Sequence, residues 1–368
     1  MPRPDERLPG PMDTAPSYIG IGNERGLTLL ELLLVVTILS AVAWVSLASV
    51  ANDAEQIRYD DTRNRLRSIR GAVVGDTGTA GWEKGIQSGF VVDNGRLPGS
   101  INDLIMAPSG FLAYGPVSPL FDPAPDTNGY NNGGETTLSQ AQNQFMKGFR
   151  GSYLVGSAGG TYRDGWGTRL SPGATLKNCP TVPSGSTNSG SDLDSDNHGW
   201  CVTLYNDGLY VDSYGKDGEN GGNDFEADMA MGEPVLAGDW RINLSGAGVR
   251  IVNQSGADLS FSTAVRASLL IFHNGASATW RRITSGVAAD TCLDGDGDGL
   301  CGGAPAPRET TATLPAENVP AGEHLLVLVA DPDGTAHNAD DSLYAGPVTA
   351  RVKFFSRGGV PDLVLIIR

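Results

Sequence analysis

A run of mostly apolar residues near the N-terminus is the strongest feature of the hydrophobic pattern. It extends from Leu27 to Ala51, and its one charged residue is Glu31. A helix rises about 1.5 Å per residue, so a run of roughly 25 residues is long enough to cross a bilayer. A carboxylate inside such a run is costly unless it has a partner, which indicates a functional role for Glu31.

The pattern becomes amphipathic directly after this run. The stretch 53–70 is charged, and its apolar positions Leu66 and Ile69, with Val73 beyond them, are spaced by three and four residues. This spacing places the three side chains on one face of a helix. We therefore predict one long helix over 27–75 whose second half packs on a globular head.

The C-terminal third shows a different pattern, with short apolar runs separated by Gly, Asp and Pro turns. We expect strands at 239–244, 249–252, 259–261, 268–272, 278–283, 324–330, 348–355 and 363–367. Several short strands at this spacing are typical of an antiparallel sandwich. A change in composition near 232–235 separates this part from the Gly- and Pro-rich part before it. The sequence thus predicts a head at 76–235, with a strand at 203–211, and a second domain at 236–368.

The start of the apolar run reads Gly26-Leu-Thr-Leu-Leu-Glu31 and resembles the processing site of type IV prepilins and type II secretion pseudopilins. The resemblance implies that residues 1–26 are a leader, which a prepilin peptidase removes between Gly26 and Leu27. It also implies N-methylation of the new Leu27 amine and pairing of Glu31 with that amine on a neighbouring subunit. Leu27 stands where the family usually has Phe, and the leader is long for the family. A secretory signal peptide has a shorter apolar core and a basic n-region, and a plain membrane anchor gives no reason for Glu31.

Three later fragments resemble segments of the pseudopilin head. They are Phe90-Val-Val-Asp-Asn-Gly-Arg-Leu-Pro98, the short helical segment 101–106, and the turn Asp164-Gly-Trp-Gly167. The resemblance implies an α+β pilin-like fold, with the long N-terminal helix packed on a small antiparallel sheet and loops. In this chain a separate all-β, sandwich-like domain follows that head.

The segment 213–228 resembles the calcium loop of the major pseudopilin of type II secretion. It contains Ser-Tyr-Gly-Lys-Asp-Gly, a Gly-rich spacer and then Asp-Phe-Glu-Ala-Asp. Calcium takes six to eight oxygen ligands, and glycines let a loop turn its carbonyls inward. The ligands that the resemblance implies are Asp217, Asp224 and Asp228, with Glu226 as an alternate and the carbonyl of Tyr214. An acidic, solvated turn is the other interpretation.

A second candidate metal site lies in the C-terminal domain. Asp294, Asp296 and Asp298 alternate with glycine and resemble the front half of an EF-hand loop. The twelfth position is Pro305, which cannot supply the bidentate Glu of that loop. A disulfide between the flanking cysteines is one way to hold these carboxylates together. A polar turn without metal is the alternative.

Charge and cysteine content limit which compartments and which partners are compatible with the sequence. The formal net charge is -16, which argues against nucleic acid and anionic membrane surfaces as partners. The four cysteines allow three disulfide connectivities, and loop proximity favours Cys179–Cys201 and Cys292–Cys301. Together with the export signal, an even number of cysteines indicates an oxidising compartment.

These patterns predict a structural subunit of a type II secretion pseudopilus or a type IV pilus-like filament, stabilised by calcium. The expected partners are like or related pilin subunits, prepilin peptidase and an inner-membrane assembly platform. Before assembly the chain is expected to cross the inner membrane once, with its head in the periplasm. We find no catalytic motif in the sequence and do not expect an enzyme. The alternative is a pilus-associated minor subunit or adhesin whose C-terminal β domain binds a surface ligand, and an exported enzyme on a membrane anchor is the least favoured class.

Overall fold

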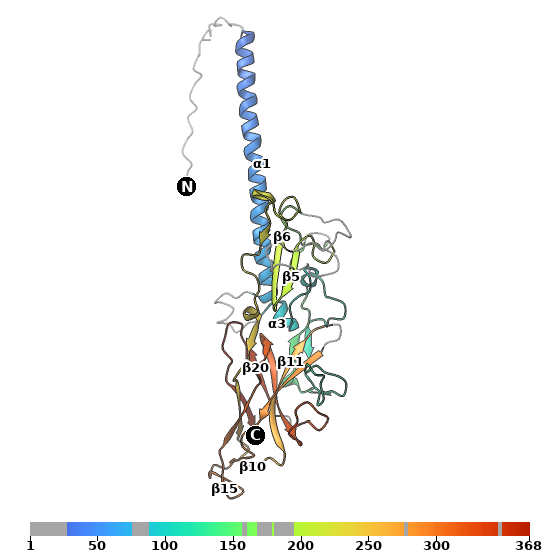
Figure 1. Ribbon diagram of the computed structural model, residues 1–368, viewed down its shortest axis with the longest axis vertical. Coiled ribbons are helices and arrows are strands. Elements are labelled where there is room, and N and C mark those ends of the chain that lie inside the picture. The colour runs from blue at the N-terminus through green and yellow to red at the C-terminus, as the bar shows by residue number, and fades with distance from the viewer. Residues whose placement is uncertain are drawn as a thin grey trace, which may run out of the picture. The chain divides into compact units, whose positions relative to one another are not determined.

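The computed structural model describes residues 28–75, 88–156, 160–167, 179, 195–275, 279–344 and 348–368 (Figure 1). The chain divides into two units, residues 1–54 and residues 55–368. Its elements are one long helix at the N-terminal end and a mostly β remainder with several small sheets. This confirms the predicted order of a helix followed by β-rich structure.

The longest element is the helix α1, Leu29–Val74. It agrees with the predicted helix at its C-terminal end, while Leu27 lies outside the described residues. The large apolar side chains between Leu29 and Val50 are 45–83% exposed. By length and composition α1 could span a membrane, as the sequence predicted.

The last part of α1 belongs to the hydrophobic core of the head. Leu66, Ile69 and Val73 are at most 2% exposed and pack in one cluster with Trp200 and Val211. The predicted helical face is thus buried. The head also contains the short helix α3, Phe90–Asn94, and the 3-10 turn η1, Asn102–Leu104.

The head contains a three-stranded antiparallel sheet of β5, Cys201–Tyr205, β6, Gly208–Ser213, and β7, Met229–Ala230. The predicted single strand over 203–211 is wrong, because a hairpin turn divides it. Asn206 and Asp207 form that turn with φ angles of 48° and 59°. Asn and Asp are the non-glycine residues that tolerate this left-handed region, and two such residues in a row suit a hairpin turn.

The segment 113–149 lies between α3 and the second half of the chain and adds short paired strands. These are β1, Gly115–Val117, with β4, Phe145–Lys147, and β2, Leu120–Phe121, with β3, Thr136–Thr137; the 3-10 turn η2, Ala141–Asn143, precedes β4. Phe121 and Phe145 share a buried cluster with Phe272 and Trp280. Side chains on both sides of the composition change near residue 235 therefore build one core.

The C-terminal part contains two main sheets (Figure 1). The larger sheet joins β12, Thr279–Val287, β11, Ala264–His273, and β18, Gly322–Asp331, with β19, Ser342–Leu343, and β20, Thr349–Phe354, both paired to β18. The smaller sheet joins β16, Glu309–Thr313, β9, Gly248–Asn253, and β21, Leu363–Ile367. Ile251 and Leu365 of the smaller sheet pack in one buried cluster with Leu269 and Leu326 of the larger one.

The expected strands of this part are present, with two differences. The strand β21 pairs with β9 in parallel, so the smaller sheet is mixed rather than antiparallel. The predicted strand 239–244 begins instead with a helical turn, α4, Ala237–Trp240, before β8, Arg241–Asn243. The carboxylate of Asp239 accepts a hydrogen bond from the Leu236 N–H at 2.9 Å and holds this turn.

Three minor strand pairs complete the C-terminal part. They are β8 with β17, Asn318–Pro320, β10, Leu259–Ser260, with β13, Cys292–Leu293, and β14, Leu300–Cys301, with β15, Ala304–Pro305. Both disulfides join the cysteine pairs that loop proximity favoured, Cys179–Cys201 and Cys292–Cys301.

Candidate metal centre

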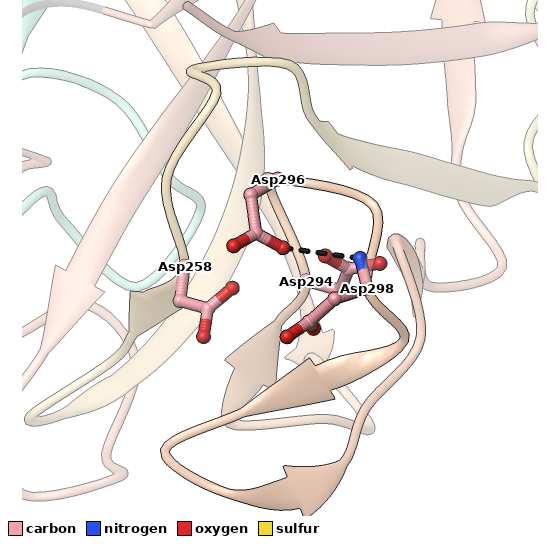
Figure 2. A group of neighbouring side chains, drawn as sticks. All are labelled: Asp258, Asp294, Asp296 and Asp298. Atoms are coloured by element: carbon pink, nitrogen blue, oxygen red, sulfur yellow. Dashed lines mark hydrogen bonds between the residues drawn. The ribbon is translucent and has the colours of Figure 1, made fainter.

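Four aspartates from two segments form a carboxylate cluster (Figure 2). Asp294, Asp296 and Asp298 lie in the turn between β13 and β14, and Asp258 directly precedes β10. One carboxylate oxygen from each residue lies within 4.8 Å of the others. Within the described ranges, this is the one group of three or more His, Cys, Asp or Glu side chains with that geometry.

Strand pairing and a disulfide bring the two segments together. β10 and β13 are antiparallel, with Leu259 opposite Leu293, so Asp258 and Asp294 come next on the two strands and lie opposite one another just beyond the end of the ladder. The disulfide Cys292–Cys301 closes the turn that carries the other acids. Sequence reasoning missed Asp258, because the register between strands that lie far apart in the chain leaves no local signal.

Backbone N–H groups hold the carboxylates of the turn in place. Asp294 is 5% exposed and accepts hydrogen bonds from the N–H groups of Gly297 at 2.7 Å and Gly299 at 3.1 Å. These bonds favour the charged form, and the hydrogen bond from Gly297 is the main cause of the lowered pKa of Asp294. Asp296 and Asp298 accept from the N–H groups two residues further on, at 3.0 and 2.8 Å.

This arrangement suits a hard cation. Ionised carboxylates held close repel one another, and a divalent cation with oxygen ligands relieves that repulsion. Asp258, Asp296 and Asp298 are exposed, so an ion has access from solvent. The cluster therefore has the ligand chemistry of a calcium or magnesium site.

The head loop at 213–228 is arranged differently. Asp217 accepts the N–H of Glu219 at 3.0 Å, and Asp228 accepts the N–H of Gly221 at 2.7 Å. Asp224 begins the 3-10 turn η3, Asp224–Glu226, with a φ of 52°. The structure does not gather these carboxylates, nor that of Glu226, into one group like that of the C-terminal cluster.

The remaining implied ligand of that loop is the carbonyl of Tyr214. The Tyr214 side chain is buried, and burial raises the pKa of its hydroxyl. Its neighbour Gly215 has a φ of 70°, and a Cβ there would meet the Glu226 carbonyl at 2.5 Å. Glycine thus lets the two ends of the loop approach closely. Calcium binding at 213–228 stays a prediction.

The N-terminal site is described only in part. Gly26 and Leu27 lie outside the described residues. Glu31 lies in the first turn of α1, and its carboxylate accepts a hydrogen bond from the Thr28 N–H at 2.9 Å. Thr28 Oγ1 in turn accepts the Glu31 N–H at 3.3 Å. Glu31 and Thr28 therefore form a capping box within one chain, a role that sequence reasoning did not assign.

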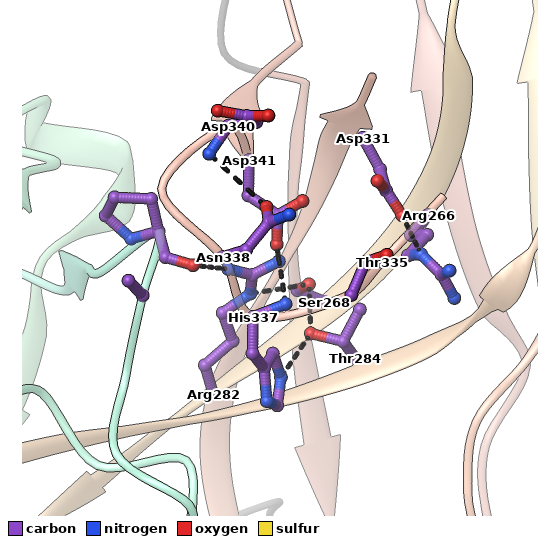
Figure 3. A network of polar contacts seen from close by, with 12 residues as sticks. Arg266, Ser268, Arg282, Thr284, Asp331, Thr335, His337, Asn338, Asp340 and Asp341 are labelled. Carbon is purple, nitrogen blue, oxygen red and sulfur yellow. Dashed lines mark hydrogen bonds and ion pairs between the residues drawn. The ribbon is translucent and has the colours of Figure 1, made fainter. Parts of the chain in front are cut away.

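In a second acidic turn, residues 331–341, two aspartates form ion pairs with arginines (Figure 3). Asp331 pairs with Arg266, and Asp341 pairs with Arg282 at 2.7 Å with both side chains fully buried. Arg282 also donates to Ser268 Oγ at 3.1 Å. Asp331 and Asp333 repeat the two-residue spacing found at 294–298, but here buried guanidinium groups neutralise Asp331 and Asp341, the two carboxylates that face the core.

The Arg282 network continues to a histidine. Ser268 Oγ lies 3.0 Å from Thr284 Oγ1, which lies 2.9 Å from His337 Nε2 (Figure 3). Burial and the neighbouring Arg282 lower the pKa of His337, so the ring is neutral near pH 7. The network ties the turn 331–341 to β11 and β12.

No family model, no curated protein and no solved structure matches this chain. What the protein does is therefore inferred from its own residues and their geometry. The features that bear on function are the helix α1 with Glu31 in its first turn, the carboxylate cluster, and the separate hydrophobic clusters of the β-rich part.

Proposed function

We propose that this chain is a structural subunit of a pilin-like filament, a type II secretion pseudopilus or a close type IV pilus relative. In this proposal prepilin peptidase cuts between Gly26 and Leu27, and the helix α1 first anchors the subunit in the inner membrane. Assembly then brings α1 into contact with α1 of other subunits. Like or related subunits, the peptidase and an inner-membrane assembly platform are the partners, and the chain is not an enzyme.

The observation that carries this proposal is the division of α1 into two parts with opposite surroundings. Between Leu29 and Val50 its large apolar side chains are exposed, whereas Leu66, Ile69 and Val73 belong to the core of the head. Exposed apolar surface of this extent needs lipid or other protein to cover it. A helix that is an anchor at one end and a core element at the other is what a pilin-like subunit requires.

Glu31 and the leader distinguish this proposal from a plain anchor. A single carboxylate at the start of an apolar helix is costly in lipid, and its capping of the helix N-terminus reduces that cost within the monomer. After cleavage the amine of Leu27 would lie one residue before Thr28. A neighbouring amine of this kind is the partner that we propose for the Glu31 carboxylate in the filament.

Calcium is the cofactor that we propose. The cluster of Asp258, Asp294, Asp296 and Asp298 has the better geometry for an ion, and the loop 213–228 is the second site. Extracellular modules bind calcium with dissociation constants of about 10⁻⁴–10⁻³ M. Calcium is plentiful outside the cell, so a site of this affinity would be filled there. Calcium would stabilise the exported domains rather than take part in a reaction.

One observation favours a more specialised subunit. One buried hydrophobic cluster is built entirely from residues between Ile242 and Ile367, so the C-terminal part has a core of its own. A subunit with such an addition suits a minor position or the tip of a filament, where the addition meets a surface ligand. In that case the purified chain should bind cell-surface glycans or proteins through its C-terminal part.

The test of the proposed function is processing followed by assembly. The substitution Gly26→Val should block cleavage and leave a precursor that is larger by the 26-residue leader. Gly20→Val, in the same leader but away from the cut, is the matched control and should be processed normally. Negative-stain microscopy of sheared surface filaments, with an antibody against the C-terminal part, should label filaments of the wild-type chain and of the control. Normal cleavage of the Gly26→Val chain would contradict the proposal.

A further inference from the structure

A groove of about 1050 Å³ lies between the second part of α1 and the segment 228–233. Its helix wall is a stripe of residues spaced by four, which share one face of α1: Tyr59, Arg63, Arg67, Gly71 and Gly75. Its other wall is the segment 228–233, which contains β7. The head thus has an open channel beside the helix.

The second wall is an edge of a β-sheet. β7 is the last strand of the three-stranded sheet, and within the described residues it pairs only with β6. The Met231 N–H donates to the Val211 carbonyl at 2.9 Å, so the backbone of Met231 faces β6. Because residues along an antiparallel strand alternate in this respect, the N–H and C=O of Ala230 point away from β6. Neither group has a hydrogen bond in the part of the chain that the structure describes.

This edge, rather than one face of the sheet, borders the groove. Six consecutive residues line it, although their side chains alternate: Met229 and Met231 are buried in the core of the head, and Ala230 is exposed. A Cβ added to Gly232 would meet no atom within 4 Å, and the same holds for Gly71 on the helix wall. Between the two walls there is therefore room for a further strand.

The helix wall carries positive charge that the chain itself does not neutralise. Among the described residues no carboxylate lies within ion-pair distance of Arg63 or Arg67. On the opposite wall, Glu233 pairs with Arg70 at 3.8 Å, and the carboxylate of Asp228 accepts a backbone N–H at 2.7 Å. In a chain with a net charge of -16, two adjacent guanidinium groups of this kind mark a place for an external anion.

We infer that the groove binds an extended, acidic segment of a partner protein, which adds as a strand to the edge of β7. Its backbone pairs with the N–H and C=O of Ala230, and its carboxylates pair with Arg63 and Arg67. Addition of a strand to an open sheet edge is a general mode of peptide recognition, in which backbone hydrogen bonds hold the peptide and alternate side chains give specificity. Every second side chain of the added strand faces α1, so the acidic residues stand at alternate positions.

The dimensions of the groove fit a short segment. From Tyr59 to Gly75 the helix rises about 24 Å at about 1.5 Å per residue, which matches about seven residues of extended chain at about 3.3 Å each. A small anion would use the arginines but leave the edge of β7 unpaired, whereas a peptide satisfies both walls. The inference goes beyond assembly through α1, because the partner is a different protein and the contact needs no filament.

The test is binding of a synthetic peptide to the full-length chain, purified in detergent. The probe is a fluorescein-labelled hexapeptide in which Glu alternates with Val, and fluorescence anisotropy measures its dissociation constant. Two control peptides separate strand addition from simple attraction of charge. One has all its Glu residues before its Val residues, and the other keeps the alternation but has N-methylated backbone nitrogens. The alternating peptide should bind at least about tenfold more tightly than either control.

Substitutions on the two walls test each half of the contact. Arg67→Glu turns an attraction into a repulsion and should weaken binding about tenfold. Arg58→Glu, at an exposed arginine of the same helix outside the groove, is the matched control and should leave binding near the wild-type value. Ala230→Pro removes the outward N–H without removing a bond to β6, and proline is tolerated at such an edge position, so binding should weaken several-fold while the chain stays folded.

Filling the groove is a further test. Gly71→Leu places a side chain in open space on the helix wall, and leucine is the better helix former, so this chain should remain folded but lose the peptide. Ser68→Leu makes an equally large addition to the same helix outside the groove and should keep it.

Three results would overturn the inference. They are no measurable binding of the alternating peptide, equal binding of the three peptides, and equal binding by the wild-type and Gly71→Leu chains. A dimer of the wild-type chain that Ala230→Pro converts into monomers would also overturn it, because a second copy would then occupy the edge. None of these results bears on the proposed function, whose test is processing and the formation of filaments.

Discussion

The backbone N–H of Thr28 donates a hydrogen bond to the carboxylate of Glu31 at 2.9 Å, and the Glu31 N–H donates to Thr28 Oγ1 at 3.3 Å. The acid in the first turn of α1 therefore has a partner within its own chain before any subunit meets another. This makes two roles for Glu31 separable: capping of the helix, which an uncharged acceptor can supply, and charge pairing, which needs the carboxylate.

The first prediction uses that difference. Glu31→Leu should still insert into the membrane, because it removes a charge from an apolar segment, but its filaments should assemble slowly or not at all. Glu31→Gln keeps a hydrogen-bond acceptor for the Thr28 N–H and is the matched variant. If the charge serves docking, both variants should lose filaments in a shearing assay. Assembly of the Gln variant at the wild-type rate would show that only the cap matters.

The second prediction concerns calcium and stability. Binding to the folded chain alone stabilises it, by about 2.7 kcal/mol at a hundredfold excess over the dissociation constant. The melting temperature of the full chain should therefore be higher in calcium than in chelator. Asp296→Asn should reduce this difference by weakening the four-aspartate cluster, and Asp217→Asn should reduce it further if the head loop also binds. Asp362→Asn, at an exposed acid outside both loops, is the control. Equal melting temperatures of the wild type in calcium and in chelator would contradict both sites.

The third prediction concerns the fully buried pair of Arg282 and Asp341. Asp341→Asn leaves the guanidinium charge of Arg282 buried without a counter-charge, and loss of one partner of such a pair typically costs about 3–5 kcal/mol. Urea denaturation should show this loss as a lower midpoint. Asp340→Asn, at the exposed neighbouring position, should change the free energy of unfolding by no more than about 0.5 kcal/mol.

A double substitution tests the physical reason for that loss. Arg282→Met combined with Asp341→Leu removes both charges, so the chain should be more stable than either single variant. If the double variant is instead as unstable as the sum of the singles, the hydrogen bonds of Arg282 to the Asp122 and Pro123 carbonyls matter more than the charge pair.

The fourth prediction concerns the buried Lys147. Its Nζ donates to the Val92 carbonyl at 2.8 Å, and burial lowers its pKa from 10.5 to about 8. Between pH 8 and pH 10.5 the unfolded chain thus binds more protons than the folded chain, so the free energy of unfolding should rise with pH across this interval. This gain in the free energy of unfolding is lost as the pH falls back from 10.5 to 8, and below pH 8 the titration of Lys147 adds no further slope.

Chemical denaturation at a series of pH values measures this slope. Lys147→Met removes the titrating group and keeps most of the volume, so its curve should be flatter between pH 8 and pH 10.5. Lys353→Met, at a partly exposed lysine of β20, is the matched control and should keep the wild-type slope. If the pH slope is unchanged in the Lys147→Met chain, groups other than Lys147 cause it.

The sequence by itself determined the elements that depend on near neighbours along the chain. The apolar run and the three- and four-residue spacing of Leu66, Ile69 and Val73 predicted both parts of α1, because neighbours on a helix face lie close in sequence. Short apolar runs between Gly, Asp and Pro turns predicted most strands of the C-terminal part, because the residues of one strand are consecutive in the sequence. Loop proximity also favoured both disulfides, whose cysteines lie 22 and 9 residues apart.

The tertiary structure alone decided which distant segments meet. Asp258 joins Asp294 only through the register of β10 and β13, and Arg282 reaches Asp341 only after β12 and the turn 331–341 have folded side by side. Periodicity cannot reveal such partners, because it reports which face of an element is buried and not what covers that face. The hairpin turn at Asn206 shows the same limit on a smaller scale: alternation continues through the turn, and hydrogen bonding between β5 and β6 decides where the strand folds back.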